Sequence, residues 1–522
     1  MKGLRKALLI GMTLGMTVLG TVGCMNQNAA PSNDVLKVGG AISFAGTLEP
    51  TENYFSWAVV RFGVGETLIK FDDQMKATPW LATSWKQGDD KLTWTFTIND
   101  KVKFSNGKSL TAEAVKASLE RTFAKSKRAK TFFNYTEISA KGGQELTIKT
   151  DKEYYNLPSL LGGDPLFLIM DVTAEADGRD IAKEGPIGTG PYVVSSFTKE
   201  RAELKRNDNY WDGKVGFAKV EIPSINDANT RAMALQAGDV DMAVSIGPGE
   251  YGIFQNDKNF TVYEVASLRD VFVRMGGQKG KLQNPDLRAA LIAAADRESY
   301  AKNLMKDTFV AGKAPLPPSI DYGFDQLRDP NKYNVERAKE LLKRAGYQDT
   351  NGDGIVDKDG ENLVLDFYAY TSRPELPLYA EALQADYKKI GVDLQIKIVD
   401  YAVIDTLSQS GDYDMIISSV VTANTGEPVW FLKQYWGGTG VETNGSGFSD
   451  PRFDELLVLG ESANDPVARR NAVINAQQLM LDNAVALFLG YPKVNIVGNK
   501  KIDGIKMTPS EYYIITKDLK LK

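Results

Sequence analysis

The sequence predicts an α/β fold with mixed sheets, from the chain length and from the order of its elements. The chain has 522 residues, of which 43% are hydrophobic and 25% charged. At ~150 residues per domain this length suggests about three domains or lobes. Helical patterns alternate with strand patterns through the second half of the chain, which favours α/β lobes.

The individual elements follow from local periodicity and from their end signals. Thr111 is the expected cap of a helix whose apolar residues Ala114, Val115, Leu119 and Phe123 recur three and four positions apart. Further helices are predicted over 228–237, 335–345 and 378–390, each followed by glycine. Strands are predicted over 35–42, 94–98, 146–148, 192–197, 239–244, 363–370 and 392–399.

Composition excludes several classes of chemistry. The chain has no histidine, which removes Ser-His-Asp and Cys-His triads and histidine metal sites. Its one cysteine, Cys24, allows neither an internal disulfide nor a CxxC pair. The formal charge of −5 argues against nucleic acid as the main partner, because phosphate binding needs a basic face.

The N-terminus reads as an export signal. Three cations precede an apolar stretch over 7–22, and Cys24 follows small residues. The pattern resembles a bacterial lipoprotein signal over residues 1–23, with Cys24 as the lipidated first residue and 24–34 as a tether. One departure is Thr21, where such signals prefer leucine. The alternative is a membrane-spanning anchor, for which the apolar run is short. We expect an exported chain, lipid-anchored on the outer side of the cytoplasmic membrane.

An aspartate-rich segment has the spacing of a calcium loop. Oxygen-bearing side chains stand at loop positions 1, 3, 5, 9 and 11, and glycine at position 6. Position 12 holds Gly360 in place of the bidentate glutamate. The segment therefore predicts either a structural calcium site or a polar turn. The candidate ligands are Asp349, Asn351, Asp353, Asp357 and Asp359.

Aromatic residues in polar, loop-like segments suggest a cleft that stacks on organic ligands. Tyr54, Trp57, Trp430 and Trp436 are the candidates. The alternative for each is packing in a core or between lobes.

Several segments, taken together and in order, resemble one protein family. They are 79–85, 93–96, 102–107, 112–115, 186–192, 207–211, 230–241, 287–297, 345–347, 390–393, 412–414 and 450–454. The chain resembles the extracellular solute-binding protein family 5 of ABC importers, which comprises peptide, nickel and opine receptors.

The resemblance implies a two-lobed, periplasmic-binding-protein-like fold of the cluster C type, with an extra subdomain in lobe I. The implied lobe I comprises 35–56, 188–268 and 488–522, with 57–187 as its inserted subdomain and 269–487 as lobe II. The implied mechanism is hinge closure on a solute, followed by delivery to permease subunits. It implies a monomer that needs no cofactor and performs no chemical step.

The identity of the solute stays open at this point. Peptide-binding members hold the ligand ammonium with an aspartate, and the matching position here is Asn424, with Glu427 as a substitute or a turn residue. The segments at 63–68 and 509–513 look more like the nickel and opine branch. Arg269, Arg274 and Arg373 are candidates for a ligand carboxylate.

We favour a short peptide or peptide-like solute, held through backbone and aromatic contacts. The second possibility is a metal–metallophore or opine complex in which the chelator supplies the metal ligands. Other classes that fit less well are a secreted hydrolase and a peptide-signal receptor without transport.

Overall fold

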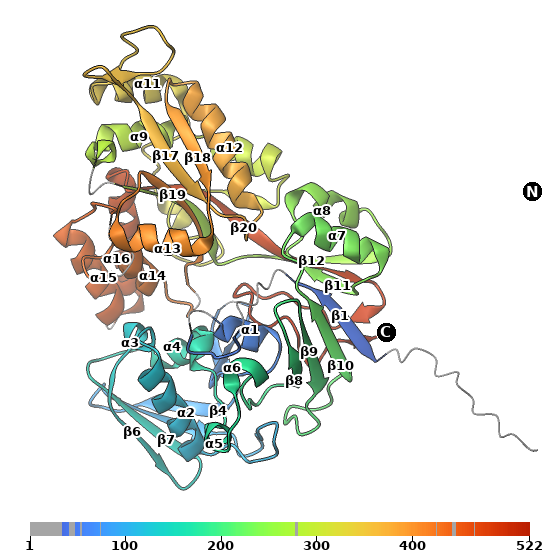
Figure 1. Ribbon diagram of the computed structural model, residues 1–522. Helices are drawn as coiled ribbons and strands as arrows, with labels where there is room; N and C mark the ends of the chain where they lie inside the picture. The colour runs from blue at the N-terminus through green and yellow to red at the C-terminus, as the bar shows by residue number, and fades with distance from the viewer. Residues whose placement is uncertain are drawn as a thin grey trace, which may run out of the picture. The chain divides into compact units, whose positions relative to one another are not determined.

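The fold has the predicted α/β class, and a mixed sheet of 12 strands forms its centre (Figure 1). The computed structural model describes residues 34–522 except 41–46, 53–54, 74, 277–279, 424, 441–444 and 464. The strands of this sheet are β1 (Val35–Gly39), β8 (Tyr192–Phe197), β9 (Arg201–Arg206), β10 (Lys219–Pro223), β11 (Met242–Val244), β12 (Phe260–Ala266), β13 (Arg269–Met275), β14 (Phe309–Ala311), β17 (Val364–Ala369), β18 (Asp393–Ile398), β19 (Met415–Val421) and β20 (Ala486–Asn499).

The large sheet has the order β18-β17-β19-β13-β20-β11-β1-β10-β9-β8, and β12 and β14 also pair with β20. β1 runs parallel to β10 and β11, and β17 runs parallel to β18 and β19. The remaining pairs are antiparallel. The sheet is therefore mixed, as predicted.

A second sheet of four strands has the order β4-β5-β7-β6. Its strands are β4 (Ala82–Gln87), β5 (Thr93–Ile98), β6 (Tyr135–Lys141) and β7 (Glu145–Thr150). In the described part of the chain there are three two-stranded antiparallel sheets: β2 (Ile69–Phe71) with β3 (Ala77–Pro79), β15 (Asp357–Lys358) with β16 (Glu361–Asn362), and β21 (Ile502–Asp503) with β22 (Lys520–Leu521).

The helices flank these sheets. α2 packs on β6 and β7, and α12 packs on β17, β18 and β19. Figure 1 shows α7 and α8 next to β11 and β12. The helices are α1 (Ser56–Arg61), α2 (Ala112–Lys125), α3 (Ala129–Phe132), α4 (Leu157–Gly163), α5 (Thr173–Ala176), α6 (Ile181–Glu184), α7 (Ala228–Ala237), α8 (Pro248–Gln255), α9 (Pro285–Ala294), α10 (Arg297–Ser299), α11 (Val335–Arg344), α12 (Glu375–Lys388), α13 (Tyr401–Ser410), α14 (Val429–Trp436), α15 (Pro451–Ser462) and α16 (Pro466–Asp482).

The four helices that the sequence predicted are present as α2, α7, α11 and α12. The hydroxyl of Thr111 accepts a hydrogen bond from the amide of Ala114 at 3.2 Å, which confirms the predicted cap of α2. α7 ends at Gly238, whose φ of 80° is a left-handed conformation that glycine adopts without strain. α12 begins at Glu375, three residues before the predicted start.

Strand β20 joins two parts of the large sheet. Its residues up to Pro492 pair with β13 and β14, and those from Lys493 pair with β12. Ser267 and Leu268 form the short link between β12 and β13 beside it. The chain therefore crosses between the two parts of the sheet twice, once in β20 and once at Ser267 and Leu268, and the two crossings lie next to each other. Two adjacent crossings of this kind are suited to a hinge.

Separate apolar cores lie on either side of this link. One core gathers residues of α9, α11, α12, β17 and β19, and another gathers residues of β1, β9, β10 and the C-terminal segment. A third fills the space between the four-stranded sheet and α2. Residues of α1 pack in the core of β1, although 57–187 is the predicted inserted subdomain. The predicted domain boundaries stay a prediction. Among the described residues, no helix is long and apolar enough to cross a membrane.

Candidate functional site

A cavity of about 760 Å³ is lined by residues from α1, β13, β19, α14, β20 and the C-terminal segment. This volume lies within the range of ~300–1,000 Å³ that is usual for small-molecule sites. Among the described residues, six cationic and four acidic side chains line it, so this part of the wall carries excess positive charge although the whole chain is acidic. They are Arg61, Arg128, Arg231, Arg269, Arg373, Lys493, Asp164, Glu375, Asp405 and Glu511.

Three arginines of this wall surround the buried carboxylate of Glu511. Arg269 Nε lies 3.0 Å from Oε1 of Glu511, and Arg61 Nη2 lies 3.4 Å from Oε2. Arg373 Nη2 lies 3.9 Å from the same Oε2. These arginines come from β13, from α1 and from the segment before α12. We call Arg61, Arg269, Arg373 and Glu511 the arginine cluster.

The arginine cluster sets the protonation of its members. Burial alone would raise the pKa of Glu511, but the positive charges of Arg269, Arg373 and Arg61 outweigh it and lower this pKa to about 2. Burial lowers the pKa of Arg61 to about 10, and the charge of Glu511 opposes that shift. At neutral pH Glu511, Arg61 and Arg269 are therefore charged.

The arginines of the cluster differ in how open they are to a ligand. Arg269 Nη1 donates to the backbone oxygen of Ser419 at 2.8 Å, whereas its buried Nη2 has no hydrogen-bond partner among the described residues. The side chain of Arg373 is 23% exposed, and its contact with Glu511 is long for an ion pair. A planar guanidinium with unused N–H groups suits a carboxylate ligand.

Aromatic side chains form another part of the wall. Trp57 lies 6.4 Å from Tyr512, centroid to centroid, and its ring faces the guanidinium of Arg61 at 5.7 Å. Trp430 stacks on Phe132 with centroids 5.0 Å apart and planes inclined by 5°. The cavity therefore combines guanidinium groups with flat apolar surfaces, which suits a small organic solute that carries carboxylates.

Comparison with known proteins identifies the family. The family model described as "Bacterial extracellular solute-binding proteins, family 5 Middle" matches residues 76–443. The chain belongs to this family.

Relatives within family 5 cover nearly the whole chain. The nickel-binding protein NikA of Staphylococcus aureus is 28% identical over 459 residues, which are 87% of this chain and 89% of that protein. The oligopeptide-binding protein AppA of Bacillus subtilis is 26% identical over 464 residues, 85% of this chain and 83% of the relative.

A crystal structure of S. aureus NikA in complex with Ni(L-His)2 superposes with a TM-score of 0.82. It is 26% identical and covers 94% of this chain and 100% of that one. The two-lobed, cluster C fold expected of family 5 is thereby confirmed.

The residues that the sequence predicted for the ligand site occupy different places. Trp57, Arg373 and Trp430 line the cavity. Tyr54 and Asn424 lie outside the described residues, as does the lipidation candidate Cys24. The structure therefore brings three of the predicted side chains together in one cavity wall.

Trp436 and Glu427 lie away from the cavity wall. Trp436 is 2% exposed and packs in an apolar core against Phe272 and Phe431. Glu427 accepts a hydrogen bond from the hydroxyl of Tyr322 at 2.7 Å. Burial raises the pKa of Glu427, and the hydrogen bonds from Tyr322 and Tyr155 oppose this in part.

The predicted loop character of two aromatic segments is wrong. Trp57 lies in α1, and Trp430 and Trp436 lie in α14. Trp430 and Trp436 are six residues apart, and at ~100° per residue a helix turns them onto different faces. This is why one faces the cavity and the other the core.

Two of the arginines that the sequence suggested for a carboxylate have different surroundings. Arg269 belongs to the arginine cluster. Arg274 lies further along β13, where its Nη2 donates to the hydroxyl of Ser408 at 2.7 Å and its guanidinium faces the ring of Tyr435 at 5.6 Å. Sequence reasoning named neither Arg61 nor Glu511 for the site. The only signal for Glu511 is an acidic residue within the apolar, aromatic segment 509–515.

The carboxylates of the aspartate-rich loop point to backbone amides. Asp349 accepts from Gly352 and Gly354 at 2.7 and 3.0 Å, and Asp357 accepts from the amide of Thr350 at 2.7 Å. Among the described residues, no group of three or more Asp, Glu or Cys side chains is arranged to hold a metal ion. Calcium binding by Asp349, Asn351, Asp353, Asp357 and Asp359 stays a prediction, and a lower melting temperature in EDTA is its test.

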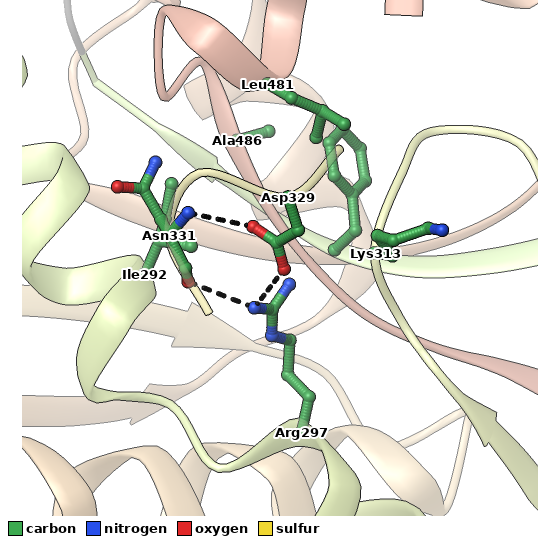
Figure 2. Close-up of a pocket in the computed structure, with 8 residues that line it drawn as sticks. Ile292, Arg297, Lys313, Asp329, Asn331, Leu481 and Ala486 are labelled. Carbon is green, nitrogen blue, oxygen red and sulfur yellow. Dashed lines mark hydrogen bonds and ion pairs between the residues drawn. The ribbon is translucent and has the colours of Figure 1, made fainter. Parts of the chain in front are cut away.

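A second, much smaller cavity lies beside Arg297 (Figure 2). Its volume is about 10 Å³, enough for one water molecule. Figure 2 shows Arg297 directed at Asp329, and their Nη2 and Oδ2 atoms lie 2.7 Å apart. Both side chains are buried, so this pair fastens the loop at 329–331 to α10 and is not a solute site.

Proposed function

We propose that this chain is the substrate-binding component of an ABC importer, and that it captures a complex of a divalent transition metal ion with an amino-acid-type chelator. The observation that carries this proposal is the arginine cluster, in which three guanidinium groups share one internal carboxylate within a cavity of excess positive charge. Such a wall suits the carboxylates of an amino-acid chelator.

The chelate also agrees with the composition of the chain. Without histidine, the protein would have to rely on the chelator for nitrogen ligands to the metal. The S. aureus relative was crystallised with Ni(L-His)2, a complex whose amino acids supply such ligands. In this proposal the metal is cargo, and Arg373, the most exposed arginine of the cluster, binds the chelator.

A short peptide, which the sequence favoured, is the second candidate. Glu375 and Asp405 line the same cavity, so an ammonium group has acidic partners there. The relative AppA is an oligopeptide-binding protein. Both candidates share a carboxylate of amino-acid origin, and the experiment below separates them.

Capture proceeds by closure of the two lobes about the link formed by Ser267, Leu268 and β20, followed by docking to permease subunits. No chemical step belongs to this cycle. We further propose that Cys24 carries a lipid that holds a monomer at the outer side of the membrane. Replacing Cys24 with serine then moves the protein from the membrane fraction to the soluble fraction, and an unchanged distribution would refute the anchor.

Isothermal titration of the purified protein tests the solute. We expect saturable binding of a 1:2 mixture of NiCl2 and L-histidine, and none of either component alone. Saturable binding of tri-alanine without binding of the mixture would show that the solute is a peptide and not a metal chelate. If the protein binds none of these and releases no small molecule in native mass spectrometry, the proposal fails.

A matched pair of arginine variants tests the site. Arg373→Gln should weaken binding of the mixture about 10- to 100-fold, because it removes a charged donor from the wall. Arg328→Gln is the control, since its side chain is 71% exposed and pairs with Asp482 on the surface. Equal affinities of the two variants would remove Arg373 from the site.

A further inference from the structure

Glu511 occupies an unusual position for a carboxylate. Its side chain is 3% exposed. Its backbone has a φ of 64°, a left-handed conformation that costs a non-glycine residue free energy. Its amide donates to the backbone oxygen of Thr508 at 3.0 Å. The chain therefore makes a turn here, and the side chain of Glu511 points to the three arginines of the cluster. Strained conformations of this kind are maintained where the surroundings require them.

Both oxygens of Glu511 are held by positive or polar groups. Oε1 faces Arg269 Nε at 3.0 Å and accepts from the hydroxyl of Ser267 at 3.2 Å. Oε2 faces Arg61 and, at a longer distance, Arg373. Glu511 therefore takes the place in the cavity wall that a ligand carboxylate would otherwise take.

The charges of the cluster do not balance within the protein. Three guanidinium groups face Glu511, and the buried carboxylate of Glu375 is the other acidic group that acts on Arg269. The three guanidinium groups outnumber these two carboxylates, and Arg373 is the most exposed of the three arginines and so the one that a solute carboxylate can reach.

We propose that Glu511 is a specificity-determining residue: it occupies one of the carboxylate positions of the arginine cluster and thereby sets how many negative charges the solute brings. This inference deepens the proposed function and rests on it. The wild-type cluster accepts a solute that places one carboxylate against Arg373. A neutral side chain at position 511 leaves one more positive charge of the cluster for a second carboxylate of the solute to balance.

Two substitutions should change the charge preference in opposite directions. Glu511→Gln leaves an uncompensated guanidinium and favours a dianion over a monoanion. Arg373→Gln removes a positive charge and favours the monoanion. A unit charge at ~5 Å in a partly buried site is worth more than the ~1.4 kcal/mol that changes affinity tenfold. In each variant we therefore expect the ratio of the dissociation constants for the monoanion and the dianion to shift about tenfold or more.

The experiment measures the binding of acetate and malonate to the full-length protein by thermal shift, at constant ionic strength. The readout is the ratio of the two dissociation constants. It should move toward malonate in Glu511→Gln and toward acetate in Arg373→Gln. Glu66→Gln is the matched control, a buried glutamate that does not line the cavity, and should keep the wild-type ratio.

An unchanged ratio in both variants overturns the inference, as does equal weakening of both anions, which a merely structural role would produce. If Glu511→Gln does not fold, Arg373→Gln decides alone: a wild-type ratio in that variant refutes the proposal. Failure of the proposed function is a separate result, since it is measured with the nickel–histidine mixture and tri-alanine on the wild-type protein.

Discussion

Two buried glutamates, Glu511 and Glu66, show how differently this protein treats the same side chain. Glu511 is 3% exposed and Glu66 is 6% exposed. The pKa of Glu511 is lowered to about 2, because the charges of Arg269, Arg373 and Arg61 outweigh the effect of burial. Burial raises the pKa of Glu66 to about 7.

The partners of Glu66 explain its raised pKa. Its carboxylate accepts hydrogen bonds from the hydroxyls of Thr189 and Tyr210 at 2.8 and 2.9 Å, and from Trp211 Nε1 at 3.1 Å. These donors are neutral, and they offset the cost of burial only in part. Lys70 is the cation that acts on Glu66, and its Nζ stacks over the ring of Trp80 at 4.1 Å.

Glu66 and Glu511 represent two uses of a buried carboxyl group. Hydrogen bonds from the neutral groups of Thr189, Tyr210 and Trp211 hold Glu66, and burial outweighs them and raises its pKa to about 7. Formal charges hold Glu511 in the cavity wall, where its ionised form is required to gather the arginines. Only the second arrangement makes a site whose charge can select a solute.

The largest effect should come from removing the charge of Glu511. Glu511→Gln leaves three buried or partly buried guanidinium groups with one fewer acid, and breaking such a pair costs about 3–5 kcal/mol. Urea unfolding at pH 7 measures this loss. Glu336→Gln, whose side chain is 81% exposed, is the control and should change the free energy of unfolding by less than about 0.5 kcal/mol. A loss below about 1 kcal/mol in Glu511→Gln would contradict the description of the cluster.

The free energy of unfolding that Glu511→Gln loses should also depend on pH, by nearly the same amount. The folded pKa of Glu511 lies below its unfolded value of about 4.3, so its contribution is present above pH 4.3 and is lost as the pH falls toward 2. The difference in stability between the wild type and Glu511→Gln should therefore shrink by about 3 kcal/mol over this window. Chemical denaturation at several pH values provides the comparison. A constant difference down to pH 2 is inconsistent with an ionised Glu511.

Glu66→Gln should behave in the opposite way. The folded pKa of Glu66, about 7, lies above the unfolded value, so its stabilising contribution is complete below pH 4.3 and is lost as the pH rises to 7. An amide does not titrate, and the variant should therefore be more stable than the wild type by about 1–3 kcal/mol at pH 8. At pH 4 the two proteins should be nearly equal. A variant that is less stable than the wild type at pH 8 would show that the carboxylate is needed in its charged form.

The sequence predicted the local parts of this structure better than the site. The cap of α2 at Thr111 and the end of α7 at Gly238 depend on residues within one helical turn, and local patterns contain that information. The cavity residues Trp57 and Trp430 were suggested by type alone. The helix α14 that turns Trp430 and Trp436 apart was not recognised, because its eight residues are too few to show a clear period.

The arginine cluster depends on tertiary structure and has no local signal. Arg61 and Glu511 are 450 positions apart and meet through the return of the C-terminal segment to α1. Periodicity and composition describe neighbours along the chain, and they do not say which distant charges will share one wall. Arg373 was suggested by its ability to bind a carboxylate, whereas its partner Glu511 required the fold.

The smallest effect should come from one of the neutral donors to Glu66. Tyr210→Phe removes the hydroxyl that donates to Oε1 of Glu66 and should cost about 1 kcal/mol. This hydrogen bond lowers the pKa of Glu66, so its removal should raise that pKa further. Because the lost donor serves the charged carboxylate most, the melting temperature should fall more at pH 8 than at pH 4. Tyr333→Phe, on a ring that is 40% exposed, is the control. Equal losses at both pH values would mean that the hydroxyl of Tyr210 stabilises the protonated and the charged carboxyl group equally, and that this donor does not govern the ionisation of Glu66.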